Sequence, residues 1–230
     1  MPDEIDESLL DFVQRRTLDY FWEFAHPVSG LARMRSNITT TYGPDVISIG
    51  GAGFGIMAII VGVARRWLPR ADAVERLLLA TNFLWHRTDS FHGAFPHLVD
   101  GASGRTIPFR ASSRKDDGGD LVETSYLCMG LLCARQYFKH DTSGETELRR
   151  NIDRIWEQID WRWYTRNGAN VLYWHWSPNN GWGMNQEIRG WNECLVAYIL
   201  AASAPVHDID AQVYHHGWPQ GYTFRNGRSY

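Results

Sequence analysis

Apolar residues along this chain follow two helical patterns that alternate. In residues 5–25 the apolar positions recur at helical spacing with charges between them, which is typical of a helix with one buried face. In residues 48–67 the pattern is apolar on every side, which is typical of a helix surrounded by protein. Helices of the first type are expected over 5–25, 71–87 and 145–160, and helices of the second type over 48–67, 120–138 and 191–202.

This alternation predicts an all-α fold of the (α/α)6 toroid type. In such a barrel an inner ring of helices is sheathed by an outer ring, and only the inner helices are shielded on every side. The expected inner helices begin at intervals of about seventy residues, which is longer than the period of solenoid repeats. Three helix pairs are half of a closed six-pair toroid. We therefore expect residues 1–230 to form a single domain, a half barrel that is truncated at its C-terminal end.

Two short β-hairpins are expected between the helices. Residues 94–109 turn at Asp100-Gly101, and residues 163–176 turn at Asn167-Gly168. Both dipeptides favour a tight turn between paired strands. Each segment comes just before an expected inner helix, so both hairpins should lie on the rim where those helices begin.

The composition is that of a globular protein and narrows the range of partners. Of the 230 residues, 44% are hydrophobic, which is enough to bury a substantial core. The net charge of -3 gives no basic field, so no nucleic-acid partner is expected. The three cysteines lie in apolar helical stretches and their number is odd, which favours buried thiols over a disulfide framework.

Two stretches bear on membranes and export. Residues 46–64 carry no charge and are long enough to be considered as a membrane span. Five of them are glycine, and a helix buried within the protein explains the run as well, so no membrane span is expected. The first seven residues are acidic where a secretory signal would be basic and then apolar, so the chain as given is expected in the cytoplasm.

Acidic residues gather at the start of the second expected inner helix. Asp120 and Glu123 are three residues apart and share one helix face, and Asp116 lies four residues earlier. A capping box would explain this spacing, with Asp120 as the N-cap and Glu123 reaching back to it. Similar spacing at the expected outer helices, from Asp72 and from Thr142, shows that spacing alone is weak. The adjacent acids 116–117, the glycines 118–119 and the apolar helix favour a functional site.

Glu193 begins the third expected inner helix, which is otherwise uncharged. Because it follows Trp191, its carboxyl group is expected to lie between a wet cavity and an apolar wall. Such surroundings raise the pKa of a carboxyl group toward that of a general acid. The alternative is a structural role, in which Glu193 interacts with the helix dipole in the first turn.

Aromatic residues are concentrated beside these acids. Six of the eleven tryptophans fall between residues 161 and 191, and residues 173–179 place aromatic side chains in a strand and turn. Flat rings beside amides and acids suit the apolar faces of pyranose rings, so the sequence suggests a sugar-cleaving cavity. The histidines lack zinc-motif spacing. Calcium binding by Asp116, Asp117 and Asp120 is a weaker alternative, because the EF-hand loop pattern is missing. Neither a metal nor a cofactor is expected.

Several long motifs in the chain resemble the bacterial glycoamylase-like family, which includes endo-β-1,2-glucanases of glycoside hydrolase family 144. The resemblance runs in collinear order from about residue 8 to residue 220. The chain departs from the family in length, because the family's domains run to twice this size. The motifs that carry the resemblance are residues 29–33, 53–58, 91–97, 115–124, 173–178 and 189–194.

The resemblance implies an (α/α)6 barrel that hydrolyses β-glucan, β-1,2-linked in the characterised members, with inversion at the anomeric carbon. By position, Glu193 matches the acid that protonates the leaving oxygen. The cluster of Asp116, Asp120 and Glu123 matches the acids that line the scissile subsite, and which of them is the base stays open. Relatives are often exported. Residues expected to bind the saccharide are His97, Trp174, His175, Trp176, Trp182, Trp191 and Asn192.

A second interpretation is a non-catalytic saccharide-binding or assembly module, or an inactive fragment of such an enzyme. In that case the aromatic cleft is kept, but an open half barrel does not position the attacking water. Exposed inner helices in a half ring would also leave large apolar patches, which normally drive association. The expected partners are therefore an oligosaccharide or polysaccharide and, through the open side of the half barrel, a second copy of the chain.

Overall fold

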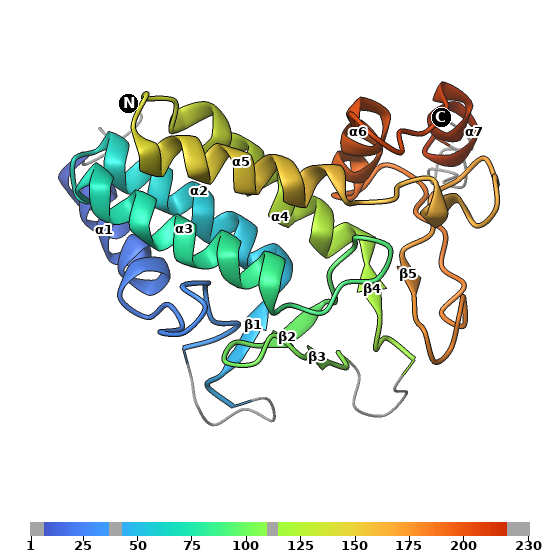
Figure 1. The fold of residues 1–230 in the computed structure, drawn as a ribbon, viewed down its shortest axis with the longest axis horizontal. Helices are drawn as coiled ribbons and strands as arrows, with labels where there is room; N and C mark the ends of the chain where they lie inside the picture. The colour runs from blue at the N-terminus through green and yellow to red at the C-terminus, as the bar shows by residue number, and fades with distance from the viewer. Residues whose placement is uncertain (1–6, 37–42, 110–114, 220–230) are drawn as a thin grey trace, which may run out of the picture.

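The computed structural model describes residues 7–36, 43–109 and 115–219, and this part of the chain is mostly helical with small antiparallel sheets (Figure 1). All six helices that the hydrophobic pattern predicts are present. The helices are α1 (Glu7–Trp22), α2 (Ile49–Ala64), α3 (Arg70–His86), α4 (Leu121–Tyr137), α5 (Ser143–Glu157), α6 (Leu195–Ser203) and α7 (Ala211–Gly217), with a short 3-10 helix η1 (Trp163–Thr165). The strands are β1 (Val46–Ser48), β2 (Leu98–Asp100), β3 (Thr106–Ile107), β4 (Gly119–Asp120) and β5 (His175–Trp176).

The inner helices α2 and α4 pack so closely that their contact requires glycine. A Cβ atom on Gly53 would lie 2.1 Å from the carbonyl oxygen of Tyr126, and one on Gly130 would lie 2.2 Å from the carbonyl oxygen of Gly53. Neither position has room for a side chain, because the neighbouring atoms belong to backbone. The glycines of these helices therefore bring two buried helices into direct backbone contact.

The outer helices α3 and α5 pack against each other and run in front of α2 and α4 (Figure 1). Leu148, Ile152 and Ile155 of α5 are fully buried in the core that these helices share. The guanidinium of Arg70, at the start of α3, donates hydrogen bonds to both carboxylate oxygens of Glu145 on α5, at 2.7 and 2.9 Å. The alternation of patterns in the sequence thus corresponds to two layers of helices.

The end of the chain differs from the sequence-based expectation in two ways. The third inner helix begins at Leu195 rather than at residue 191, because the side chain of Asn192 forms a turn: its Oδ1 accepts from the N–H of Cys194 at 2.9 Å. A short helix, α7, follows where none was expected. Asp210 caps it by accepting from the N–H of Gln212 at 2.8 Å. Seven residues are too few to give a clear helical period in the sequence.

The hairpin expected over residues 94–109 is confirmed. β2 and β3 pair antiparallel with Val99 opposite Thr106, and the turn between them begins at Asp100. β1, which directly precedes α2, adds to the other edge of β2 with Ile47 opposite Val99. The resulting three-stranded sheet lies at the N-terminal end of α2, because β1 leads directly into that helix.

The hairpin expected over residues 163–176 is wrong. The turn exists, with Asn167 and Gly168 at positive φ, but the segment before it is η1 rather than a strand. β5 pairs instead with β4, placing His175 opposite Asp120. A Cβ atom on Gly118 would lie 2.0 Å from the carbonyl oxygen of Trp176, so glycine is required where these two segments meet. The partner of β5 is thus the segment that leads into α4.

None of the described helices combines the length and the hydrophobicity that a membrane span needs. The uncharged run 46–64, which was considered as a span, forms β1 and α2, and α2 packs against α1, α3 and α4.

Candidate functional site

A cleft of about 430 Å³ opens at the N-terminal end of α4 and contains three of the four predicted acids. One side is formed by the start of α4 and by the segment before β2, and the other by residues 186–194. This arrangement brings residues that are up to about a hundred positions apart onto one surface. The polar residues that line the cleft are His97, Asp120, Glu123, Gln186, Glu187, Arg189, Asn192 and Glu193, and Phe109 and Trp174 are its aromatic residues.

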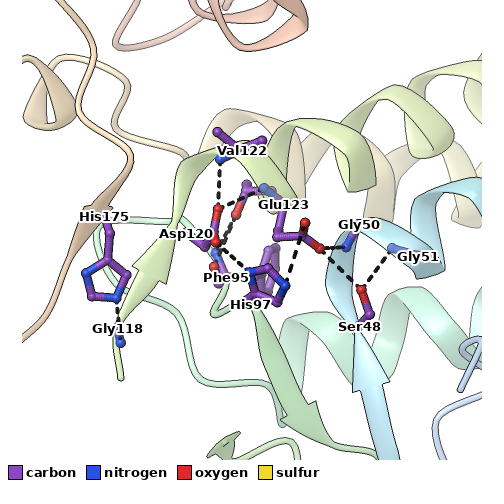
Figure 2. Close-up of polar contacts among 11 residues, drawn as sticks. Ser48, Gly50, Gly51, Phe95, His97, Gly118, Asp120, Val122, Glu123 and His175 are labelled. Carbon is purple, nitrogen blue, oxygen red and sulfur yellow. Dashed lines mark hydrogen bonds and ion pairs between the residues drawn. The ribbon is translucent and has the colours of Figure 1, made fainter. Parts of the chain in front are cut away.

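Asp120 is the N-cap of α4 and is fully buried. Its Oδ1 accepts hydrogen bonds from the backbone N–H groups of Val122 and Glu123, at 3.0 and 2.9 Å (Figure 2). Its Oδ2 lies 2.9 Å from Nδ1 of His97. The capping interpretation is therefore correct for Asp120, but its second oxygen is directed toward the cleft residues.

Glu123 does not complete a capping box with Asp120. Its side chain crosses to the next inner helix, where Oε2 accepts from the N–H of Gly50 at 2.9 Å and from the hydroxyl of Ser48 at 3.3 Å (Figure 2). Burial raises the pKa of the Glu123 carboxyl group, and the charge of Asp120 raises it further. The carboxylate thus joins the N-terminal ends of α2 and α4, and its other oxygen, Oε1, faces His97.

His97 lies between the two carboxylates (Figure 2). Its ring is stacked on Phe109 with a centroid separation of 3.9 Å, and its Nε2 is 3.9 Å from Oε1 of Glu123. Burial lowers the pKa of the imidazole, but the hydrogen bond and the charge of Asp120 outweigh it, so that the pKa of His97 is raised. The site therefore holds a readily protonated ring beside two acids.

Glu193 lies on the opposite side of the cleft, but its surroundings differ from the expectation. It is exposed and belongs to the turn before α6, so it is neither in the first turn of that helix nor covered by an apolar wall. The hydroxyl of Tyr126 donates to the backbone carbonyl oxygen of Glu193 at 3.2 Å. One turn of α4 after Glu123, Tyr126 thus ties the loop that carries Glu193 to the helix that carries Glu123.

Asp116 and Asp117 lie outside the cleft lining. Asp116 is buried. The side chain of Asp117 accepts from the hydroxyl of Ser177 and from the amides of Asn179 and Asn180, at 2.8 Å and 3.2 Å for the amides. Burial opposes the ionised form of Asp117, but these hydrogen bonds outweigh it and lower the pKa of the carboxyl group. Asp117 therefore holds the loop that follows β5.

Three of the seven predicted saccharide-binding residues line the cleft: His97, Trp174 and Asn192. His175 is buried behind it, where Nε2 accepts from the N–H of Gly118 at 3.1 Å and burial lowers the imidazole pKa. The other three lie elsewhere. Trp176 and Trp182 pack around Trp163 and His92, and the exposed Trp191 contacts Trp218 edge-on.

The sequence interpretation missed several residues of the cleft. Gln186, Glu187 and Arg189 line it, but they lie in an irregular segment whose sequence shows neither helical nor strand periodicity. Arg189 falls within one of the motifs shared with the glycoamylase-like family, which was the available signal. Among the described residues, no group of three or more histidine, cysteine, aspartate or glutamate side chains is arranged to hold a metal ion.

A larger cavity, of about 550 Å³, lies between residues 160–170 and the loop that joins α6 to α7. The acidic side chains that line this cavity are engaged in hydrogen bonds that stabilise the fold. Asp208 accepts from Arg162 at 2.7 Å, Asp210 caps α7, and Asp160 accepts from the N–H of Trp163 at 3.0 Å. The acidic cleft at α4 is therefore the better candidate for chemistry.

Comparison with known proteins shows clear relatives, although no protein-family model matches the chain. The exo-β-1,2-glucooligosaccharide sophorohydrolase (non-reducing end) of Parabacteroides distasonis is 45% identical over 214 residues, covering 93% of this chain and 29% of that protein. A glucoamylase-like protein of Bacteroides uniformis matches in structure with a TM-score of 0.91 and 48% identity, covering 99% of this chain and 54% of that one. The endo-β-1,2-glucanase of Chitinophaga pinensis, in complex with sophorotriose and glucose, matches with a TM-score of 0.87 and 48% identity, covering 92% of this chain and 50% of that one.

These matches confirm the resemblance that the motifs indicated. The chain is homologous to glucoamylase-like proteins and to β-1,2-glucanases of glycoside hydrolase family 144. It spans about half the length of the two solved structures and less than a third of the curated relative.

Proposed function

We propose that this chain, a homologue of β-1,2-glucan hydrolases over about half of their solved length, carries a glycoside hydrolase site that cleaves β-1,2-linked glucan with inversion. The observation that carries the proposal is the position of Glu123 and Glu193 on opposite sides of one cleft. An inverting glycosidase needs two carboxyl groups that flank the scissile bond, about 6.5–9.5 Å apart, so that a water molecule fits between the sugar and the base.

In this proposal Glu193 is the general acid and protonates the oxygen of the departing sugar. Glu123 is the general base, because Asp116 lies outside the cleft lining and both carboxylate oxygens of Asp120 are engaged in hydrogen bonds, whereas Oε1 of Glu123 lies 3.9 Å from Nε2 of His97, beyond hydrogen-bond distance. Glu123 takes a proton from water as the water attacks the anomeric carbon, the glycosidic C–O bond breaks, and the bonding electrons leave with the oxygen that Glu193 protonates. The new hemiacetal then has the α configuration.

The remaining cleft residues suit a saccharide. Trp174 offers an aromatic face for a pyranose ring, and Gln186, Asn192 and Arg189 supply hydrogen-bonding groups. The relative from Chitinophaga pinensis was solved with sophorotriose and glucose, which supports an oligosaccharide as the ligand class for this cleft.

We further propose that the described helices are half of an (α/α)6 toroid. The inner row α2, α4 and α6 is continuous, since α4 contacts both neighbours. Phe54 and Val61 of α2 and Ile199 of α6 are exposed, which is unusual for large apolar residues on inner helices. Exposed apolar residues of this kind favour association, and a second copy of the chain is the partner that we propose.

The test of the proposed function is an assay of reducing ends released by this chain from linear β-1,2-glucan. Parallel reactions with β-1,3- and β-1,4-glucans are the matched controls, and the Chitinophaga pinensis enzyme is the positive control. We expect release from the β-1,2-linked polymer alone, with the α-anomer of the product detected first by NMR. Initial release of the β-anomer would contradict inversion.

Calorimetry alongside this assay distinguishes the hydrolase from a saccharide-binding module. A chain that binds sophorotriose saturably in calorimetry but releases no reducing ends is a saccharide-binding module. A chain that neither binds nor cleaves any of the glucans would contradict both the hydrolase and the saccharide-binding interpretation.

A further inference from the structure

His97 is held in the site by three separate contacts. Its backbone carbonyl oxygen accepts from the N–H of Ile49 at 3.1 Å, which ties it to the start of α2. Its ring is stacked on Phe109. Its Nδ1 lies 2.9 Å from Oδ2 of Asp120. Together these contacts fix the position and the orientation of the imidazole in the site.

Asp120 determines which ring nitrogen carries a proton. The carboxylate is fully buried, and its Oδ1 is already occupied by two backbone N–H groups of α4. An ionised carboxylate only accepts hydrogen bonds, so Nδ1 of His97 is the donor. The ring is therefore held with Nε2 toward Oε1 of Glu123, at 3.9 Å, and protonation of Nε2 places a positive charge next to that oxygen.

Glu123 requires such support. Burial and the charge of Asp120 both disfavour its ionised form, whereas the N–H of Gly50, the hydroxyl of Ser48 and the charge of His97 favour it. A general base must be ionised to accept a proton from water. The first two favourable contacts engage Oε2, so His97 is the group that acts on the oxygen facing the cleft.

We propose that His97 is a positioning residue that orients and electrostatically supports the Glu123 carboxylate, with Asp120 holding the imidazole in place. This inference rests on the proposed function, since it assigns His97 a role in the same reaction. Other titratable groups surround this pair. They are Asp116 and His175, which are buried behind the cleft, Tyr126 on the next turn of α4, and Glu187, Arg189, Glu193 and Cys194 on the opposite side of the cleft.

The test compares His97→Asn with a matched control, His92→Asn. The asparagine amide occupies roughly the position of Nδ1, so it can still donate to Asp120 while the charge beside Glu123 is removed. His92 is likewise stacked on an aromatic ring, Trp163, at 3.6 Å, but it lies outside the acidic cleft. Carbon-detected NMR follows the titration of the Glu123 carboxyl carbon, which Glu123→Gln identifies by loss of the signal.

We expect the pKa of Glu123 to rise in His97→Asn and to stay at the wild-type value in His92→Asn. An unchanged Glu123 titration in folded His97→Asn overturns the inference. This readout requires no turnover, so it decides the role of His97 even if the wild-type chain releases no reducing ends and the proposed function fails.

Two further measurements complete the test. In kinetics on β-1,2-glucan, loss of His97 should move the acidic limb of the kcat/KM profile to higher pH, with KM within about twofold of wild type. A large rise in KM with an unmoved limb would make His97 a substrate-binding residue instead. If His97→Asn does not fold, the wild-type imidazole is titrated directly: a His97 pKa above the ordinary 6.5, falling in Asp120→Asn, is expected, and a value at or below 6.5 overturns the inference.

Discussion

The carboxylate of Glu123 on α4 accepts a hydrogen bond from the backbone N–H of Gly50 on α2 at 2.9 Å. Seventy-three positions separate the two residues in the sequence. The contact joins the N-terminal ends of two inner helices. It fixes the position of a carboxylate in the cleft through the backbone N–H of a glycine. A Cβ atom on residue 50 would lie 2.6 Å from Oε2 of Glu123.

Gly50→Ala should therefore displace the Glu123 carboxylate and reduce catalysis. Misplacement of a catalytic group by about 1 Å can cost on the order of 10²-fold in rate. We expect a loss of that size in kcat/KM on β-1,2-glucan. Gly144→Ala on α5 is the control, since its Cβ would meet only the side chains of Val74 and Leu78, which do not line the cleft. Equal kcat/KM in the two variants would contradict the proposal that the contact between Gly50 and Glu123 positions the catalytic carboxylate.

Glu193→Gln separates chemistry from a structural role. The change keeps the size of the side chain but removes the transferable proton, so turnover should fall by at least ~10²-fold. The melting temperature should change little, because Glu193 is exposed. Asp72→Asn, at the exposed start of the outer helix α3, is the matched control. If the wild-type chain is active and Glu193→Gln turns over substrate at the same rate, Glu193 is not the general acid.

Gly53→Ala should lower the free energy of unfolding of the protein rather than act on the catalytic groups directly. The added Cβ would lie 2.1 Å from the backbone oxygen of Tyr126, so α2 and α4 must move apart. Overpacking of this kind costs typically about 1–3 kcal/mol, and backbone neighbours place the cost at the upper end. Urea unfolding measures the change. Gly144→Ala on α5, where a Cβ would meet a side-chain methyl group at 3.2 Å, should be much milder.

The ion pair between Arg70 and Glu145 predicts a specific loss of stability in acid. The hydrogen bonds from Arg70 lower the pKa of Glu145 below its ordinary value of 4.5. A depressed folded-state pKa contributes stability that is present above 4.5 and is lost as the pH falls through the lower folded-state pKa. Glu145→Gln should cost roughly 1.5–3 kcal/mol near neutral pH and flatten the stability profile below pH 4.5. The exposed Glu147→Gln on the same helix should leave the profile unchanged.

The exposed apolar residues of the inner helices predict self-association. Phe54, Val61 and Ile199 are 46%, 45% and 57% exposed, respectively, and combined replacement by serine should shift the chain toward monomer in analytical ultracentrifugation. Leu79→Ser, at a 42% exposed position of the outer helix α3, is the control and should leave the distribution unchanged. A wild-type chain that is monomeric at all concentrations tested contradicts this prediction.

The sequence by itself determined the helices α1 to α6 and their arrangement in two layers. Apolar periodicity within a single helix reports how many of its faces are buried, and this is a local property of neighbouring residues. The capping role of Asp120 and the turn at Asp100 were predictable for the same reason, because the interacting groups lie within a few positions of each other.

Only the tertiary structure decided how the site is assembled. The capping-box alternative had Glu123 reach back to Asp120, but the partner of Glu123 is Gly50. The strand β5 was expected to pair within its own segment, but its partner is β4. The carboxyl group of Glu193 was expected to lie between a wet cavity and an apolar wall, but Glu193 is exposed, in the turn that Asn192 forms before α6. For Glu123 and for β5 the competing partners are chemically equivalent in the sequence, because any backbone N–H group or strand edge can satisfy the same group. The close backbone packing of α2 against α4, and of β4 against β5, selects which partner is within reach.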